Sequence, residues 1–118
     1  MNKALPIPEG EQLHALTGGL KDVYQLLTSY LGDLDREPNF RRHITVTKKQ
    51  LAEHLRRHPD LAARHVSKPS DTRYHESPVL EWSDGNYRVF EVDRGRPRYV
   101  IEFAELADAA AEFLMWGW

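Results

Sequence analysis

The histidines are the first residues to weigh for chemistry. His54 and His58 lie four residues apart in a segment expected to be helical, which is the spacing of two metal ligands on one helix face. However, Arg56 and Arg57 crowd the same turn and oppose a divalent cation, and no His-Glu-x-x-His motif is present. We therefore predict surface histidines on a cationic helix and no metal site.

A nucleophilic serine would need a histidine and an acid beside it. The candidate serines lie in predicted loops and none occupies a Gly-x-Ser-x-Gly elbow: Ser67, Ser70, Ser77 and Ser83, with His65 and His75 near them in sequence. The carboxylates Glu91, Asp93 and Glu102 lie close to arginines, so cross-strand ion pairing explains them more simply than general acid catalysis. The sequence predicts neither an enzyme nor a cofactor site.

A basic stretch over residues 41–66 suggests a different function. Thr47-Lys48-Lys49-Gln50 has the pattern of a helix N-terminal capping box, and Pro59-Asp60 is typical of the first turn of a second helix. Such a pair resembles a helix-turn-helix, with Arg64 and His65 exposed on the second helix and a later hairpin as a wing. Acidic residues in that hairpin would repel phosphate, so we keep a winged helix-turn-helix DNA-binding regulator as the alternative function.

Strand period and turn chemistry agree best between Val79 and Phe103. Asp84-Gly85 and Arg94-Gly95 separate three alternating apolar runs, which predicts a three-stranded antiparallel meander. Two-residue turns would place these pairs opposite each other: Trp82 and Tyr87, Leu80 and Val89, Glu81 and Arg88, Val79 and Phe90, then Val92 and Pro97, Glu91 and Arg98, Phe90 and Tyr99, Val89 and Val100. One face then carries Val79, Phe90, Val92, Tyr99, Ile101 and Phe103, and we expect this face to be the core.

Helices are expected in the sequence both before and after the meander. Apolar residues recur at helical spacing from Glu11 to Leu31, and Gly18-Gly19 interrupts this pattern. Further helices are expected at about Lys48–Arg57, from Pro59, and at about Ala104–Met115. The predicted fold is α+β, with an N-terminal helix, short central helices, the meander and a C-terminal helix. Residues 1–118 form a single domain in this interpretation, with an extended arm over 1–10 and an exposed loop over 67–78.

Composition adds constraints on location and partners. The 118 residues contain no cysteine, and neither a signal peptide nor a membrane span is recognisable, so we expect a soluble, cytoplasmic chain without membrane association. Residues 1–35 hold two basic and five acidic side chains, residues 36–73 ten and four, and residues 74–118 four and nine. This basic island between acidic parts is typical of either a solvated surface or a charged interface.

One resemblance is carried by the C-terminal part of the chain. Asp84-Gly85-Asn86-Tyr87-Arg88-Val89-Phe90-Glu91-Val92-Asp93-Arg94-Gly95, then Arg98-Tyr99-Val100-Ile101-Glu102-Phe103 and the alanine-rich segment ending Glu112-Phe113-Leu114, is similar to the closing segment of small immunity proteins from bacterial polymorphic-toxin and contact-dependent inhibition systems. These proteins commonly show a tyrosine-rich strand, a tight turn, a strand ending in Phe and a short final helix.

The resemblance implies a protein that binds a cognate toxin domain and blocks its active site without catalysis of its own. The acidic C-terminal third is then the first candidate contact surface, because electrostatic complementarity speeds association with a basic cleft. Its expected partner-binding residues are the apolar anchors Trp82, Tyr87 and Trp118 and the acidic rim Asp84, Glu91 and Asp93. The basic island facing an acidic toxin remains the other possibility, and the oligomeric state stays open.

Overall fold

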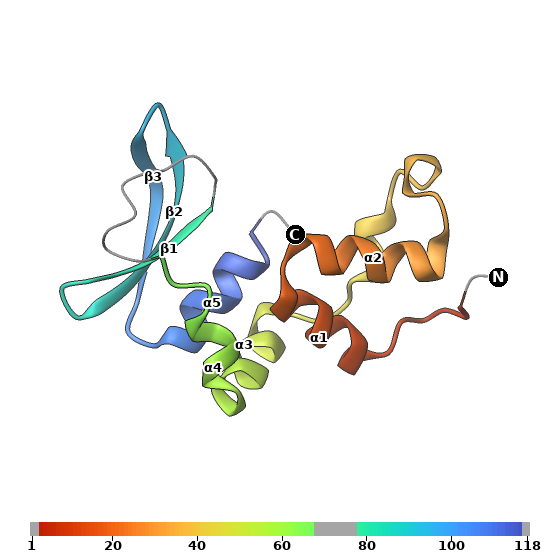
Figure 1. The fold of residues 1–118 in the computed structure, drawn as a ribbon, viewed down its shortest axis with the longest axis horizontal. Helices are drawn as coiled ribbons and strands as arrows, with labels where there is room; N and C mark the ends of the chain where they lie inside the picture. The colour runs from red at the N-terminus through yellow and green to blue at the C-terminus, as the bar shows by residue number, and fades with distance from the viewer. Residues whose placement is uncertain (1–2, 68–77, 117–118) are drawn as a thin grey trace. The chain divides into compact units, whose positions relative to one another are not determined.

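The computed structural model describes residues 3–67 and 78–116 and confirms the α+β class (Figure 1). The chain divides into two compact units, an N-terminal unit up to Thr47 and a C-terminal unit from Lys48 onward. The interpretation of residues 1–118 as a single domain stays a prediction, and each unit is described by itself.

Two helices form the body of the N-terminal unit, α1 (Glu9–Gly18) and α2 (Leu20–Leu31). Gly19 separates them with φ of 102°, a left-handed value that favours glycine, so the helical pattern breaks here. The predicted arm over residues 1–10 was too long by two residues, because Glu9 and Gly10 already belong to α1. The carbonyl of Pro8 accepts the backbone N–H groups of Glu11 and Gln12, which starts the helix at this point.

The core of the N-terminal unit is small and mixed. Its buried apolar residues come from both helices and the flanking segments: Ile7, Ala15, Leu16, Val23, Leu27, Tyr30 and Val46. Leu20 is one of the apolar residues at helical spacing, but its side chain is 56% exposed. The reason is that α2 is a separate helix that starts at Leu20, so its buried side is not an extension of the buried side of α1. Two 3₁₀ turns follow, η1 (Leu34–Arg36) and η2 (Phe40–His43), and the Phe40 ring lies edge-on to Tyr24 with centroids 5.8 Å apart.

The C-terminal unit begins with the two central helices that the sequence predicts, α3 (Lys48–Arg57) and α4 (Pro59–Ala63). Leu51, Ala52 and Leu55 form the buried side of α3, as expected. The unit ends with α5 (Leu106–Leu114), which packs against α3, α4 and the sheet. All four alanines of α5 are buried: Ala107, Ala109, Ala110 and Ala111. Their small side chains allow the other elements to approach α5 closely.

The meander consists of β1 (Val79–Ser83), β2 (Asn86–Asp93) and β3 (Arg96–Phe103) in the order β1-β2-β3. All four predicted pairs between β1 and β2 are confirmed. In the first turn Asp84 and Gly85 have φ of 50° and 87°, and in the second Arg94 and Gly95 have 53° and 77°. Positive φ at both central residues is the geometry of type I′ turns, whose twist matches that of the strands.

The predicted register between β2 and β3 was right only near the turn. Val92 pairs with Pro97 and Glu91 with Arg98, but then Val89 pairs with Ile101 instead of Val100. A β-bulge lies between these pairs, where Tyr99 and Val100 together oppose Phe90, and Tyr99 has φ of 56°. The alternation of side chains shifts by one residue beyond the bulge.

This shift also corrects the predicted core face. Ile101 and Phe103 lie on the face of Leu80, Val89 and Glu91, because directly paired residues share a face. The helix α5 packs on this face, since the indole N–H of Trp116 just beyond it donates to Glu91. We call it the α5 face. On the opposite face Val79 and Phe90 are buried, whereas Tyr99, placed there by prediction, is 65% exposed in the bulge.

Candidate functional site

Three of the predicted partner-binding residues gather at the β1–β2 turn. Trp82 is 52% exposed and pairs across the strands with the half-buried Tyr87, with ring centroids 4.8 Å apart and planes tilted by 59°. Asp84 is exposed in the turn between them. The turn therefore presents one aromatic pair beside one carboxylate, which is a plausible chemistry for a protein contact.

Two other predicted residues, Glu91 and Asp93, are engaged within the unit. The Trp116 indole N–H donates to Glu91 Oε1 at 3.0 Å, and Arg98 Nη1 donates to Asp93 Oδ2 at 2.8 Å. The hydrogen bond to Asp93 is the largest cause that raises the pKa of Arg98, with smaller contributions from Tyr99 and Glu91. These two carboxylates stabilise the sheet and its contact with Trp116, so they are less available to a partner.

The predicted acidic rim is also divided in space. Tyr87 and Glu91 share the α5 face but lie four residues apart along β2, which corresponds to roughly 13 Å in a strand. The structure thus brings together Trp82, Asp84 and Tyr87, and places Glu91 and Asp93 toward the other end of the sheet. Trp118, the remaining predicted anchor, lies outside the described residues.

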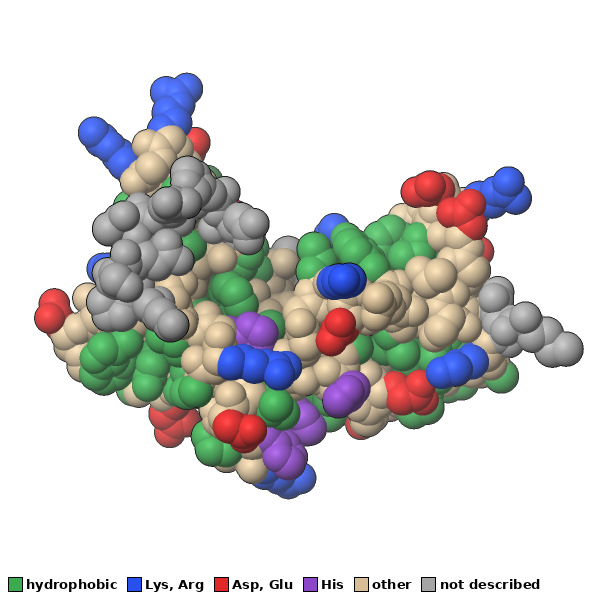
Figure 2. Space-filling model, in the orientation of Figure 1, with side chains coloured by type: hydrophobic (Ala, Val, Ile, Leu, Met, Phe, Trp, Pro, Cys, Tyr) green, Lys and Arg blue, Asp and Glu red, His purple; other side chains and the backbone are tan. Residues whose placement is uncertain are grey.

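The sequence analysis missed the exposed surface of the β2–β3 hairpin. Tyr99, Val100 and Ile101 are 65%, 45% and 40% exposed, and Arg94 and Arg96 are exposed at the turn. Figure 2 shows basic side chains projecting from the end of this hairpin. One signal was available in the sequence: Arg94-Gly95 occupies a turn in which Asn-Gly or Asp-Gly is the usual choice.

Two of the seven lysines and arginines in the stretch 41–66 pair with acidic residues in α5 or just before it. Lys48 Nζ lies 2.7 Å from Glu112, and Arg56 contacts both Glu105 at 3.2 Å and Asp108 at 2.9 Å. His58 alone separates α3 from α4, and α4 has five residues. A DNA-reading helix-turn-helix normally has a turn of 3–4 residues and a longer second helix, so this geometry does not favour the DNA-binding alternative.

The structure describes only some of the residues considered for catalysis or metal binding. The rings of His54 and His58 have centroids 4.8 Å apart, but no group of three or more potential metal ligands occurs in residues 3–67 and 78–116. His65 packs against Phe113, with centroids 5.6 Å apart. Ser70, Ser77 and His75 lie outside the described residues.

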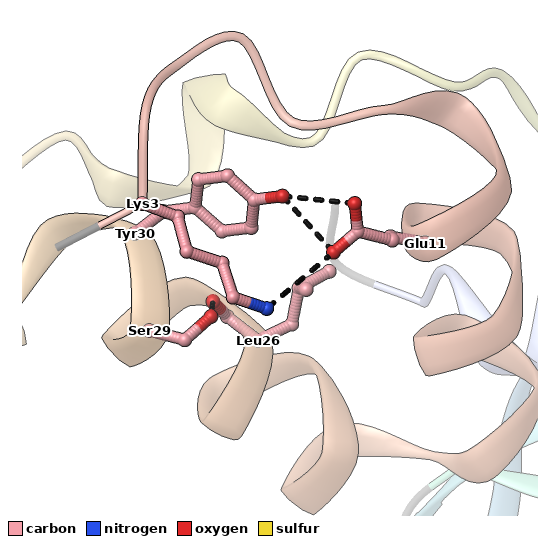
Figure 3. Close-up of polar contacts among 5 residues, drawn as sticks. All are labelled: Lys3, Glu11, Leu26, Ser29 and Tyr30. Carbon is pink, nitrogen blue, oxygen red and sulfur yellow. Dashed lines mark hydrogen bonds and ion pairs between the residues drawn. The ribbon is translucent and has the colours of Figure 1, made fainter.

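A carboxylate in the N-terminal unit is held by a phenol and an amine (Figure 3). The Tyr30 hydroxyl lies 2.9 Å from each carboxylate oxygen of Glu11 and donates to them, and Lys3 Nζ is 3.8 Å from Glu11 Oε1. Burial is the largest cause that raises the pKa of Tyr30, followed by the hydrogen bond and the charge of Glu11. The backbone N–H of Lys3 also donates to Ser29, so this cluster fastens the N-terminal arm to α1 and α2.

Neither the search for membrane-spanning helices nor the comparison with known proteins assigns a function. No helix among the residues that the structure describes combines the length and apolar character needed to cross a bilayer. Comparison with family models, with curated proteins and with solved structures finds no match to this chain.

Proposed function

We propose that this chain is an immunity protein that binds a cognate bacterial toxin domain in the cytoplasm and neutralises it by blocking its active site. The observation that carries the proposal is that large apolar side chains are left exposed on the sheet, Trp82 on β1 and Tyr99, Val100 and Ile101 on β3. Tyr and Trp are enriched at the centres of protein interfaces, so exposed aromatic side chains of this kind are typical of a docking surface.

The engagement of the charged residues supports binding rather than chemistry. Carboxylates that could act as acids or bases are held by partners inside each unit, as Glu11 is by Tyr30 and Glu91 by Trp116. The segment that resembles immunity proteins folds into β2, β3 and α5, which is the arrangement of strand, turn, strand and short helix that the resemblance implies. A toxin inhibitor needs only such a rigid, presented surface.

Co-purification followed by a growth assay tests the proposal. The affinity-tagged chain is expressed in its native host, and polypeptides that remain through a high-salt wash are identified and cloned. We expect one stoichiometric polypeptide that arrests growth when expressed alone and permits growth when this chain is expressed with it. A retained polypeptide that is harmless alone, or whose toxicity this chain does not relieve, would contradict the proposal.

A matched variant separates inhibition from other effects of expression. Replacing Trp82 by Ala removes an exposed ring whose loss should change the fold little, whereas Leu20→Ala removes an exposed apolar side chain from the N-terminal unit. Truncation of an aromatic residue that is a hot spot of an interface lowers binding by about 2 kcal/mol or more. We expect Trp82→Ala to weaken protection and Leu20→Ala to leave it intact.

A further inference from the structure

Backbone strain is concentrated in the β2–β3 hairpin. Within the described residues, three non-glycine residues have positive φ: Asp84, Arg94 and Tyr99. Asp is tolerated in this conformation, but Arg and Tyr are unfavourable there, and Tyr is a clear outlier because of its bulk. Unfavourable backbone conformations that persist in a fold cluster at functional sites, so the two outliers of this hairpin point to a role for their side chains.

The strained residues present their side chains to solvent. Tyr99 is 65% exposed, and the Arg98 guanidinium carbon lies 5.3 Å from the centroid of its ring. Val100 is exposed beside Tyr99 in the bulge, whereas Ile101 is exposed on the α5 face of the same strand. An aromatic ring, an aliphatic side chain and a guanidinium group are therefore exposed together at the bulge.

The end of the hairpin adds positive charge to this surface. Asp93 is occupied by Arg98, whereas Arg94 and Arg96 have no ion pair within the described residues and are exposed. These two arginines lie at the turn that precedes Tyr99 and Val100 on β3. Charge complementarity therefore requires a partner that is acidic where it meets the turn and apolar where it meets β3.

The strand edge itself is poorly suited to strand addition. Pro97 lacks a backbone N–H, the bulge at Tyr99 interrupts the pleat, and charged residues flank both. Proline, bulges and charges are the features by which proteins prevent an edge strand from pairing with another chain. A partner must therefore contact the side chains of the hairpin rather than extend the sheet.

We propose that the β2–β3 hairpin, through Arg94, Arg96, Tyr99 and Val100, docks onto an acidic patch with an apolar centre on a protein partner. This inference rests on the proposed function, and it assigns this hairpin to the contact surface, with an acidic toxin surface as its complement. Nucleic acid fits less well, because the exposed aliphatic side chain of Val100 gains nothing from phosphates.

Charge reversal tests the docking surface. The probe is the polypeptide that the wild-type chain retains, produced separately and measured against full-length variants at low salt. Arg94→Glu with Arg96→Glu should raise the Kd by more than about tenfold, mainly through slower association. Lys21→Glu with Arg36→Glu makes the same charge change on exposed residues of the N-terminal unit and should leave the Kd within about twofold.

A second variant guards against loss of folding. Arg94→Gly relieves the left-handed backbone and should raise Tm, while the missing guanidinium should still weaken binding of the same polypeptide. A higher Tm with weaker binding is a combination that damage to the fold does not produce. Unchanged binding by both hairpin variants would overturn this inference and leave the proposed function standing.

Two further outcomes are decisive. Failure of the wild-type chain to retain any polypeptide would overturn the proposed function together with this inference. A short DNA duplex is the second probe and is tested in the absence of a protein partner. If the wild-type chain binds it and the double Arg→Glu variant does not, the hairpin binds nucleic acid and not an acidic protein surface, which would overturn this inference.

Discussion

A single buried glutamine organises the N-terminal unit. The Gln12 amide group donates to the Ile7 carbonyl at 2.9 Å and to Thr45 Oγ1 at 3.1 Å, and its oxygen accepts the backbone N–H groups of Thr45 and Val46. Gln12 is fully buried, and so are its hydrogen bonds to the Ile7 carbonyl and the Val46 N–H, so these two groups lose a partner that water does not replace when the amide is removed. We expect Gln12→Met to lower the free energy of unfolding by roughly 3 kcal/mol, because each orphaned buried group costs 1–3 kcal/mol.

Urea unfolding followed by far-ultraviolet circular dichroism measures this effect. Gln25→Met makes the same exchange on the exposed side of α2 and should change stability by no more than about 0.5 kcal/mol. Equal effects of the two substitutions would show that the hydrogen bonds of Gln12 are dispensable. Sequence reasoning passed over Gln12, because a polar residue between apolar helix positions is normally assigned to the surface.

The Tyr30 hydroxyl makes the stability of the N-terminal unit sensitive to alkaline pH. Its pKa is raised in the folded state by burial and by Glu11, so the folded chain holds this proton more tightly than the unfolded chain. The resulting stabilisation is fully present below the ordinary tyrosine pKa of about 10 and is lost as the pH rises through the higher folded value. Lys3, the other charged group of this cluster, lies 5.5 Å from the Tyr30 ring.

We therefore expect wild-type stability to fall more steeply above pH about 10 than that of Tyr30→Phe. Urea midpoints measured across the alkaline range check this, with Tyr99→Phe as the control, because Tyr99 is 65% exposed. Parallel profiles for the wild type and Tyr30→Phe would mean that the phenol of Tyr30 titrates alike in the folded and unfolded chains.

At the scale of elements, α5 depends on small side chains. Ala110 is fully buried in a helix that packs against α3, α4 and the sheet. Replacing it with Leu adds three carbon atoms to a packed interior, and we expect a loss of about 1–3 kcal/mol in the free energy of unfolding. Ala104→Leu, at an exposed position just before α5, is the matched control. Thermal unfolding followed by tryptophan fluorescence gives both values, and a stable Ala110→Leu variant would imply room beside α5.

The elements were largely predictable from sequence, and their exceptions have local causes. The helices α3 and α4 and the register of β1 and β2 follow from caps, helical spacing and the Asp84-Gly85 turn. The register beyond Tyr99 did not follow, because bulges of this kind are usually signalled by glycine and here a tyrosine adopts the left-handed conformation. The conformation of Tyr99 decides which side chains of β3 reach solvent, so the candidate docking surface could not be predicted from the sequence.

At the scale of the whole molecule, part of the uneven charge of the sequence is complemented within the chain. Residues 1–47 hold five basic and six acidic side chains, and residues 48–118 hold eleven and twelve, so each part is close to neutral. The basic residues Lys48 and Arg56 of α3 pair with acidic residues of α5, which joins the basic island to the acidic C-terminal third. A count of charges along the sequence cannot show which residues form ion pairs between helices that are adjacent in space.

This neutralisation leads to a prediction for nucleic-acid binding. The cations of the β2–β3 hairpin are Arg94, Arg96 and the partly engaged Arg98, so at most about three phosphates can be neutralised there. If a duplex binds through this hairpin, the logarithm of its binding constant should therefore fall with the logarithm of salt concentration with a slope no steeper than about −3. Fluorescence anisotropy of a labelled duplex across a salt series measures the slope. A regulator that used the whole stretch 41–66 would neutralise more phosphates and give a much steeper slope, so a value near −6 or beyond would restore the DNA-binding alternative.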